Sequence, residues 1–525
     1  MQKRWVLLLT LIVFIALKIP HLSYPFYWDE SWPYASGVKH MLVNGPSLMP
    51  GAIDGELSRG HPLMFHFLAS LWMKLFGTSN FVMHTFPLFI TVLFMIAIYE
   101  AGLSLFDKRV AITALLLISF QQLFFVQSSF VLLEMMLAFL GFISVYFYVK
   151  KKYLLTAIAL TMLYYTKESG MIVGLVLGID AIIGLFNKQK AVKDKLYGLV
   201  SLGVPVIAIA IFFIIQKQVS GWYVLPLYSN GLETSWETYY EKIRSGCKVC
   251  FRDDLRKYYF VALVLMSLVA AAKNKSLKMA CMLIAVPIVS LLCSDGYHWL
   301  LPNYVTVILL PVVLLSVVYM MFSVTSYTNA TQKRFVLLLT WIIIVFFYYC
   351  AINMFFIDRY LQLAFVPILF IAAIYTTVIV NKINPKLYAP VLLALLCIEA
   401  YAYKKDTSLG DIKLGAFDGM YVQKDLMDFV ENENLHNKNI SIFENLQYLH
   451  LTDSTTGFKT THKPFPYVQW GTNYKTEVIM IENIEMKTAK DTFLKVSKDT
   501  SFRLAHKVER GLAWGAVFIK KDVRH

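Results

Sequence analysis

The stretch WVLLLTLIVFIALKIP at residues 5–20 precedes two adjacent carboxylates in Trp28-Asp29-Glu30. The apolar run is close to the length that crosses a bilayer. An Asp-Glu pair just after such a run is unusual, because a charge at the edge of a bilayer is costly and by default indicates function. Arg59-Gly60-His61-Pro62 then adds basic residues in the same loop. We therefore expect a membrane protein organised around the polar face at which its first span ends.

The composition of the whole chain agrees with a membrane protein. Of the 525 residues, 58% are hydrophobic and 16% are charged, whereas a soluble globular chain carries roughly 25% charged residues. The formal net charge of +15 could indicate nucleic acid. Many Lys and Arg residues, however, lie in short clusters between apolar runs, which is the pattern that sets membrane topology. We therefore expect membrane lipids, and no nucleic acid, as partners.

The start of the chain has two interpretations. Lys3 and Arg4 precede the apolar run, as in a signal peptide. No small-x-small cleavage site follows, since Lys18-Ile19-Pro20-His21 is a poor one. We interpret residues 5–20 as an uncleaved first span.

Thirteen apolar runs are predicted to be transmembrane helices, because each has about the length and hydrophobicity that a span needs. They are 5–20, 81–105, 110–126, 129–149, 152–166, 168–186, 196–216, 257–272, 276–293, 299–322, 334–356, 360–380 and 386–403. The run 62–76 is apolar but shorter, and Trp72 and Lys74 lie near its end. It is predicted to lie in the membrane interface.

The distribution of basic residues selects an orientation. With the N-terminus in the cytoplasm, nearly every cytoplasmic turn is basic, whereas the opposite turns are poor in Lys and Arg except for the longer loop 217–256, which also carries acids. The basic turns include Lys108-Arg109, Lys150 to Lys152 and Lys333-Arg334. The positive-inside rule therefore predicts a cytoplasmic N-terminus and, with thirteen spans, an exoplasmic C-terminus. We expect a bacterial inner membrane or a plasma membrane.

The chain divides near residue 405. Residues 1–404 are predicted to form the transmembrane domain, with its first outer loop at 21–80. Beyond 405 polar residues dominate, with an amphipathic pattern at 421–434 and short β-type runs at 439–443, 477–481 and 513–519. We therefore expect a small exoplasmic α/β domain at 405–525.

The cysteines give little indication of function. Cys247 and Cys250 form a C-x-x-C in a polar loop. A zinc site is not expected, because no second cysteine pair or histidine cluster lies beside it. A local disulfide and the absence of any special role both remain open.

Several polar residues are predicted to share the outer side of the membrane. Glu134 lies within an apolar run, so its carboxylate must pair or face a cavity. Simpler interpretations exist for others: Lys167-Glu168 as a surface pair, Arg359 as an interface anchor and His61 as a helix-start residue. The candidate site residues are Asp29, Glu30, Arg59, His61, Glu134, Lys167, Glu168, Arg359 and Tyr360.

The order of these motifs resembles that of a known superfamily. Trp28-Asp29-Glu30, Arg59-Gly60-His61-Pro62-Leu63 and Leu75-Phe76-Gly77 occur in the order found in GT-C glycosyltransferases. The pattern is most similar to the dolichyl-phosphate-mannose-protein mannosyltransferase and aminoarabinose transferase superfamily. Leu63 replaces the second proline of the family's His-Pro-Pro-like motif. Further matching segments are Glu134-Met-Met-Leu-Ala-Phe, Thr166-Lys167-Glu168-Ser169-Gly170 and Asp358-Arg359-Tyr360-Leu361, so that the resemblance covers most of residues 1–405.

The resemblance implies an inverting glycosyltransferase that uses a polyprenyl-phosphate sugar. It implies that Asp29 is the general base, taking the proton of an acceptor hydroxyl as that hydroxyl attacks the anomeric carbon. Glu30 would orient the acceptor or Asp29. Arg359 and Lys167, with His61 or Arg59, would stabilise the departing phosphate. No cofactor is expected, and a divalent metal is possible but not indicated.

Two other functions fit the same composition. A transporter or flippase of lipid-linked sugars would also have many helices and intramembrane charges, but more often shows internal repeats and broken helices at the midplane. A non-catalytic membrane subunit would be expected to lose Asp29. The charges gathered at one face favour the transferase, which would act on a lipid, protein or glycan hydroxyl.

Overall fold

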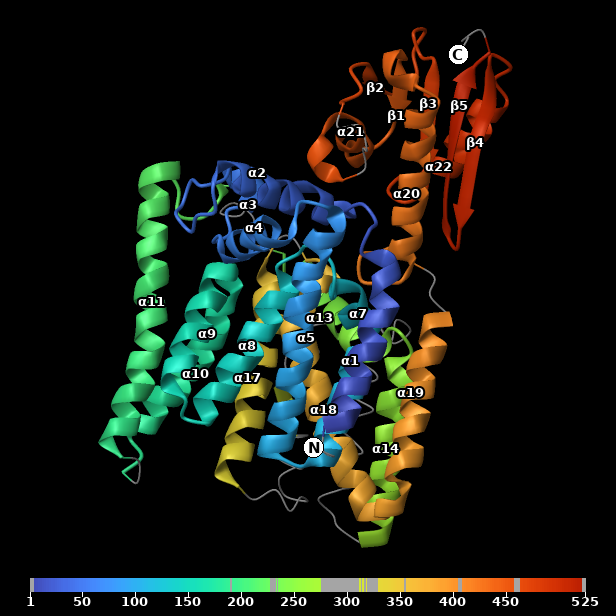
Figure 1. Cartoon of the computed structure of the whole chain (residues 1–525). Helices are drawn as coiled ribbons and strands as arrows, with labels where there is room; N and C mark the ends of the chain where they lie inside the picture. The colour runs from blue at the N-terminus through green and yellow to red at the C-terminus, as the bar shows by residue number, and fades with distance from the viewer. Residues whose placement is uncertain are drawn as a thin grey trace.

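The apolar runs of the sequence form a bundle of helices in the computed structural model (Figure 1). The structure describes residues 4–188, 191–226, 233, 235–274, five positions between 311 and 318, 329–353, 356–404, 408–457 and 463–521. Six described helical segments are long and apolar enough to cross a membrane. They are Asn80–Leu105, Glu168–Leu185, Val192–Ser220, Ala330–Ile352, Asp358–Ile383 and Pro385–Lys404. The chain is therefore an integral membrane protein with a mostly helical fold, as the sequence predicts.

Four further described helices account for most of the other expected spans. They are α1 (Trp5–Lys18), α8 (Glu134–Val149), α9 (Tyr153–Thr166) and α14 (Arg256–Asn274). The long segments comprise α5 (Asn80–Leu105), η5 and α10 (Glu168–Gly170, Met171–Leu185), α11 (Val192–Ser220), α17 (Ala330–Ile352), η7 and α18 (Asp358–Leu361, Gln362–Ile383), and η8 and α19 (Pro385–Leu387, Tyr388–Lys404). The expected span 276–293 and most of 299–322 lie outside the described residues.

Two expected boundaries were wrong. The run 110–126 is not one helix but α6 (Lys108–Ser119) and α7 (Gln122–Gln127), separated near Gln121. Gln121 is buried, its amide donates to Glu399 at 2.7 Å, and its carbonyl accepts from Arg256 at 3.0 Å. The expected helix 129–149 begins at Glu134, not at residue 129. In both places buried polar groups find distant partners, which a local pattern cannot show.

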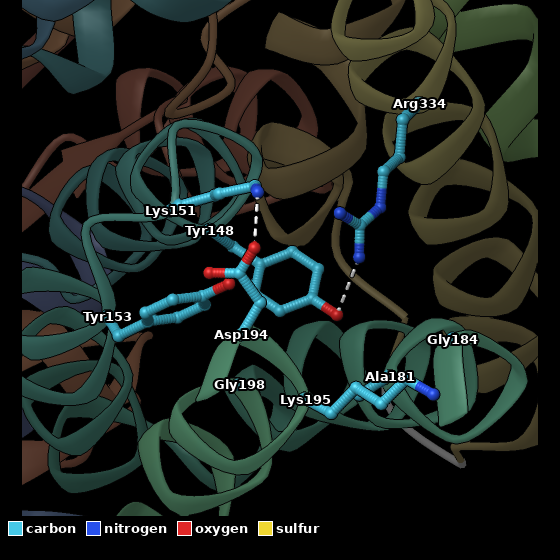
Figure 2. A pocket seen from close by; sticks show the side chains of 9 residues that line it. All are labelled: Tyr148, Lys151, Tyr153, Ala181, Gly184, Asp194, Lys195, Gly198 and Arg334. Atoms are coloured by element: carbon cyan, nitrogen blue, oxygen red, sulfur yellow. Dashed lines mark hydrogen bonds and ion pairs between the residues drawn. The ribbon is translucent and has the colours of Figure 1, made fainter. Parts of the chain in front are cut away.

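Charged residues from two of the predicted basic turns meet around one pocket (Figure 2). The Tyr148 hydroxyl of α8 donates to Asp180 of α10 at 2.9 Å and accepts from Arg334 of α17 at 2.9 Å. Lys151 pairs with Asp194 of α11 beside them. These contacts join four helices at the end of the bundle where the sequence predicts the cytoplasmic turns.

A layer of short helices covers the opposite end of the bundle. It contains α2 (Ser36–Asn44), α3 (Gly55–Ser58) and α4 (Met64–Phe76), which lie across the helix ends in Figure 1. Helix α4 corresponds to the run 62–76 that the sequence predicts to lie in the interface. Its buried residues, which include Phe65 and Met73, face the bundle, and Leu75 and Phe76 are exposed.

The C-terminal domain stands at the same end as this layer, and the N-terminus lies at the other end of the bundle (Figure 1). Its sheet has the order β2-β1-β3-β5-β4, in which β1 pairs parallel with β2 and β3, and β5 pairs antiparallel with β3 and β4. The strands are β1 (Ile440–Ile442), β2 (Val468–Trp470), β3 (Val478–Glu482), β4 (Phe502–Arg510) and β5 (Ala513–Lys520). The helices are α20 (Gly415–Asn432), α21 (Asn445–Thr452) and α22 (Ala489–Ser497). The expected small α/β domain is confirmed.

Candidate active site

Asp29 lies in a short turn that Glu30 holds in place. The turn is η3 (Trp28–Glu30), and its first residue has a φ of 47°. Glu30 is fully buried and accepts the backbone N–H of Tyr27 at 3.0 Å and that of Val131 at 2.7 Å. His84 Nε2 lies 2.9 Å from the same carboxylate. Of the two roles expected for Glu30, these contacts favour orienting Asp29 over touching an acceptor.

Arg359 connects three carboxylates from distant parts of the chain. It begins η7 together with Asp358, and its side chain is buried. One terminal nitrogen contacts Asp29 and the other contacts Asp411. Nε lies 3.9 Å from Glu134 Oε1. Burial among three acids does not fit the interpretation of Arg359 as an interface anchor.

Lys167 forms a second cation next to Arg359. Its ammonium donates to Glu134 Oε1 at 3.1 Å and lies 4.0 Å from the centre of the Tyr360 ring. Both Lys167 and Glu134 are buried. The simpler interpretation of Lys167-Glu168 as a surface pair therefore does not hold, because Lys167 turns inward to the carboxylate at the start of α8. Asp29, Glu134, Lys167, Arg359 and Tyr360 thus form one connected group, called the site cluster below.

His61 and Glu168 form a pair next to the site cluster, one residue along the chain from Lys167. His61 Nδ1 lies 2.8 Å from Glu168 Oε2, and the His61 side chain is buried. Arg59 adopts a left-handed conformation, with a φ of 52°, and its guanidinium lies 4.8 Å from the centre of the Trp32 ring. Arg59 therefore contacts the rim of the loop, whereas His61 faces the interior.

Asp29 is the open member of the site cluster. Its side chain is 39% exposed, whereas those of Arg359 and Glu134 are 2% and 0% exposed. Of these three side chains, that of Asp29 is the one accessible to a bound molecule. A half-exposed carboxylate held by a buried guanidinium can accept a proton from a bound hydroxyl while its orientation stays fixed.

Asp411 is a site residue that the sequence interpretation missed. It lies between the last span and α20, and its side chain is buried. Burial raises the pKa of the Asp411 carboxyl above its ordinary value, although the contact with Arg359 acts in the opposite direction. The signal available in the sequence was an acid directly after the last predicted span, on the same side as the other candidates.

An apolar cavity of about 270 Å³ lies between α9 and α11. Its walls include Tyr165 of α9 and Phe212 and Ile215 of α11. Met64, at the start of α4, also lines it. Two of its lining residues are neighbours of site residues in the sequence. Tyr165 precedes Lys167 by two residues, and Met64 follows His61 by three.

The described residues give no indication of a metal site. Among the parts of the chain that the structure describes, no group of three His, Cys, Asp or Glu side chains is arranged to hold a metal ion. Cys247 and Cys250 are buried where α13 (Trp236–Cys247) meets η6 (Lys248–Arg252). The expectation that the reaction needs no cofactor stays a prediction.

Residues 4–224 match the family model of dolichyl-phosphate-mannose-protein mannosyltransferase. The resemblance seen in the sequence is confirmed. This mannosyltransferase match includes Asp29, Glu30, Arg59, His61, Glu134, Lys167 and Glu168. Arg359, Tyr360 and Asp411 lie beyond it. A comparison with curated protein sequences finds no match.

Three solved structures are similar to this chain at low sequence identity. The S. cerevisiae protein O-mannosyltransferase Pmt1-Pmt2 complex bound to its sugar donor is 18% identical, with a TM-score of 0.34 over 42% of this chain and 34% of that chain. ArnT from Cupriavidus metallidurans bound to undecaprenyl phosphate is 13% identical, with a TM-score of 0.39 over 97% of each chain. The archaeal oligosaccharyltransferase AglB from Archaeoglobus fulgidus is 12% identical, with a TM-score of 0.46 over 100% of this chain and 75% of that chain. We base the proposals below on the family match and on the residues of this chain.

Proposed function

We propose that the protein transfers a sugar from a polyprenyl-phosphate carrier to an acceptor hydroxyl at the outer face of a bacterial inner membrane or a plasma membrane. The family match over residues 4–224 supports the reaction class. The observation that carries the assignment of the site is the position of Asp29, a half-exposed carboxylate in contact with the buried Arg359. The acceptor is the hydroxyl of a lipid, a protein or a glycan.

Asp29 acts as the general base in this proposal. The acceptor hydroxyl gives its proton to the Asp29 carboxylate while its oxygen forms a bond to the anomeric carbon. The bond between that carbon and the phosphate oxygen breaks, and its electron pair leaves with polyprenyl phosphate. A single displacement of this kind inverts the anomeric configuration. The products are the glycoside and polyprenyl phosphate, and the Asp29 proton passes to solvent.

The donor phosphate needs cations, because its negative charge increases as it leaves. Arg359 and Lys167 are both buried, and Asp29 is the exposed group that contacts Arg359. We infer that the phosphate takes the place of Asp29 on one edge of the guanidinium. This exchange frees the Asp29 carboxylate to accept a proton at the moment when donor is bound. Arg59 is a further cation at the rim of the loop, and His61 lies in the interior beside Glu168.

The apolar cavity between α9 and α11 suits the first part of the donor's lipid tail. Its lining is almost entirely apolar, with Phe212 and Ile215 on one wall and Met64 on another. Burial of apolar surface in such a cavity is favourable at roughly 25 cal/mol per Å². Two of its lining residues, Tyr165 and Met64, lie two and three residues along the chain from Lys167 and His61, which favours this cavity for the tail of a donor whose phosphate binds at these cations.

The test uses purified full-length protein in lipid nanodiscs with radiolabelled polyprenyl-phosphate mannose. Acceptors are supplied as membrane and cell-envelope fractions of the source cells. We expect label to pass into the acceptor fraction with wild-type protein and not with Asp29→Asn. Polyprenyl-phosphate glucose and polyprenyl-phosphate pentoses form further arms, since the family match does not fix the sugar.

The same preparation separates the alternative functions. In sealed vesicles, label that crosses the bilayer while still attached to its carrier would assign the protein as a flippase. Vesicles that show neither transfer nor crossing with any of these donors would favour a non-catalytic subunit. Either result would overturn the proposed transferase.

A further inference from the structure

We propose that Asp411 is a positioning residue of the transfer reaction, through which the segment leading into the C-terminal domain completes the site cluster. Asp411 contacts the terminal nitrogen of Arg359 opposite to the one that contacts Asp29. The Asp411 carboxylate would hold the guanidinium plane of Arg359 in one orientation and would partly neutralise its positive charge. The inference rests on the proposed function and assigns a part of it to a residue outside the family match.

The backbone around Asp411 is anchored to the bundle on three sides. The Asp411 carbonyl accepts from Gln127 of α7 at 2.8 Å, and the Leu409 carbonyl accepts the Tyr27 hydroxyl at 2.6 Å. Lys413 pairs with Asp254. A segment held by α7, by the loop of Asp29 and by residue 254 presents its carboxylate in a defined position.

The C-terminal domain also packs closely against the Asp29 loop. Gly419 of α20 faces Tyr27, and a Cβ at this glycine would lie 2.9 Å from the Tyr27 ring. The Tyr27 ring in turn stacks on Trp28, with ring centres 5.5 Å apart. The domain that carries Asp411 and the turn that carries Asp29 therefore form one packed unit around Arg359.

The electrostatic effect of Asp411 on Asp29 has a definite sign. The charged or titratable groups that interact with Arg359 are Asp29, Glu134, Asp411, Tyr360 and Tyr34, and Lys167 lies beside them on Glu134. Without the negative charge of Asp411, the guanidinium would pair more strongly with Asp29. A carboxylate held more tightly by a cation is a weaker base. Donor phosphate would also compete less well for the same edge of Arg359.

The experiment compares Asp411→Asn with Asp254→Asn in the transfer assay over a range of pH. Asp254→Asn removes the carboxylate that anchors the same segment through Lys413 and that also accepts from the buried Arg256 at 2.9 Å, but it leaves Arg359 untouched. Rates are therefore compared per amount of folded protein. Residue 254 has a φ of 52°, which asparagine tolerates well. Asp411→Glu tests whether a carboxylate at this position restores activity.

We expect Asp411→Asn to lose about tenfold or more in kcat and to move the acidic limb of the pH–rate profile to lower pH. Asp254→Asn should stay within about twofold of wild type with an unchanged limb, and Asp411→Glu should recover part of the rate. Equal losses in Asp411→Asn and Asp254→Asn, with an unmoved acidic limb, would reduce Asp411 to an anchor of the segment.

A measurement without substrate checks the pairing independently. Removal of one member of a buried ion pair leaves an uncompensated charge, which is strongly destabilising. Arg359→Met should therefore lower the apparent Tm of the purified protein, because it leaves the buried Asp411 carboxylate without its cation, and addition of Asp411→Asn should raise the Tm again. Asp411→Asn alone should lower the Tm less, because Asp29 and Glu134 still face the guanidinium. Wild-type protein that transfers no sugar, although this pairing is intact, would overturn the proposed function and with it the catalytic role of Asp411.

Discussion

The guanidinium of Arg359 contacts the carboxylate of Asp29, although 330 residues separate them in the chain. Asp29 lies just after the first span and Arg359 begins one of the last two. The contact closes the helical bundle around a polar group that would otherwise be too costly to bury. It also brings Asp29, the expected base, into contact with Arg359, which is expected to bind the donor phosphate, before any substrate is present.

Asp29→Asn should abolish transfer and leave the fold intact. Loss of a general base usually costs ~10²-fold or more, and the amide keeps the size of the side chain and a hydrogen-bond acceptor for Arg359. The measurement is the initial rate of label transfer, with the elution profile and apparent Tm of the purified variant as checks on folding.

Asp54→Asn provides a matched control in the same loop. Asp54 caps α3 by accepting the N–H of Glu56 at 2.8 Å, and asparagine caps about equally well. This control should keep nearly the full rate. More than about a tenth of the wild-type rate in Asp29→Asn would remove Asp29 from the role of base.

Much of the fold could be predicted from two local features of the sequence. The length of an apolar run indicates a membrane span, and the basic turns indicate which side of the membrane a turn faces. Runs such as 81–105 and 360–380 reappear as α5 and α18 almost unchanged. The break at Gln121 could not be predicted, because it depends on Glu399 and Arg256 far along the chain. A local pattern carries no information about such partners.

The site could be predicted in outline for the same reason. Topology places Asp29, Lys167 and Arg359 on one side, and the structure brings them into one cluster. Which acid pairs with which cation depends on tertiary packing, so the sequence could not distinguish a surface pair of Lys167 with Glu168 from the buried pair of Lys167 with Glu134. Asp411 was missed because a single acid after the last span looks like ordinary solvated linker.

Lys167→Met should destabilise the protein far more than Lys151→Met. The Lys167–Glu134 pair is buried, with side chains 9% and 0% exposed, whereas Lys151 is 59% exposed beside Asp194. Breaking a buried pair costs ~3–5 kcal/mol because a charge stays buried without its partner. An exposed pair contributes about 0–1 kcal/mol. The measurement is the apparent Tm of both variants in the same detergent.

The comparison also tests the place of Lys167 in the site cluster. We expect Lys167→Met to weaken donor binding as well, whereas Lys151→Met should leave donor binding unchanged. Equal and small shifts in Tm for the two variants would mean that water reaches the Lys167–Glu134 pair.

Residues 405–525 should lie outside the cytoplasm. The structure places the N-terminus and the C-terminal domain at opposite ends of the bundle (Figure 1), and the basic turns predict a cytoplasmic N-terminus. A reporter that is active only in the cytoplasm, fused after residue 525, should be silent, and one that is active only outside should give signal. The opposite pattern would place the site cluster on the inner side of the membrane.

The C-terminal domain should lose stability as the pH rises from about 5 to about 9. Burial raises the pKa of Glu482 to about 7, and burial together with Glu482 raises that of Glu485 to about 9. The folded state therefore binds more protons than the unfolded state above the ordinary carboxyl pKa. The state that binds more protons is stabilised less as protons become scarce, so the folded state loses stability relative to the unfolded state as the pH rises through this window.

Glu482→Gln and Glu485→Gln should flatten this dependence and raise stability at alkaline pH. Glutamine keeps the hydrogen bond that Glu482 accepts from Gln423 at 2.9 Å, and it carries no charge to bury. The measurement is unfolding of the full chain followed at pH 5, 7 and 9 through the fluorescence of its tryptophans, which include Trp514 in β5. A wild-type protein equally stable at all three pH values would show that both carboxyls are solvated.

Arg359→Lys should keep the charge and the fold yet lose most of the activity. A guanidinium can contact Asp29 and Asp411 with its two terminal nitrogens in one plane, as the structure shows. An ammonium is a single point donor on a flexible stem and cannot hold both carboxylates in that geometry. When donor phosphate replaces Asp29, lysine would have to leave Asp411 to reach the phosphate.

We therefore expect Arg359→Lys to show a fall in kcat together with a rise in the apparent KM for the donor, measured from initial rates over a range of donor concentration. A rate and a KM within about twofold of wild type would show that one positive charge is sufficient at this position, and the phosphate site would then have to be sought at Lys167, His61 and Arg59.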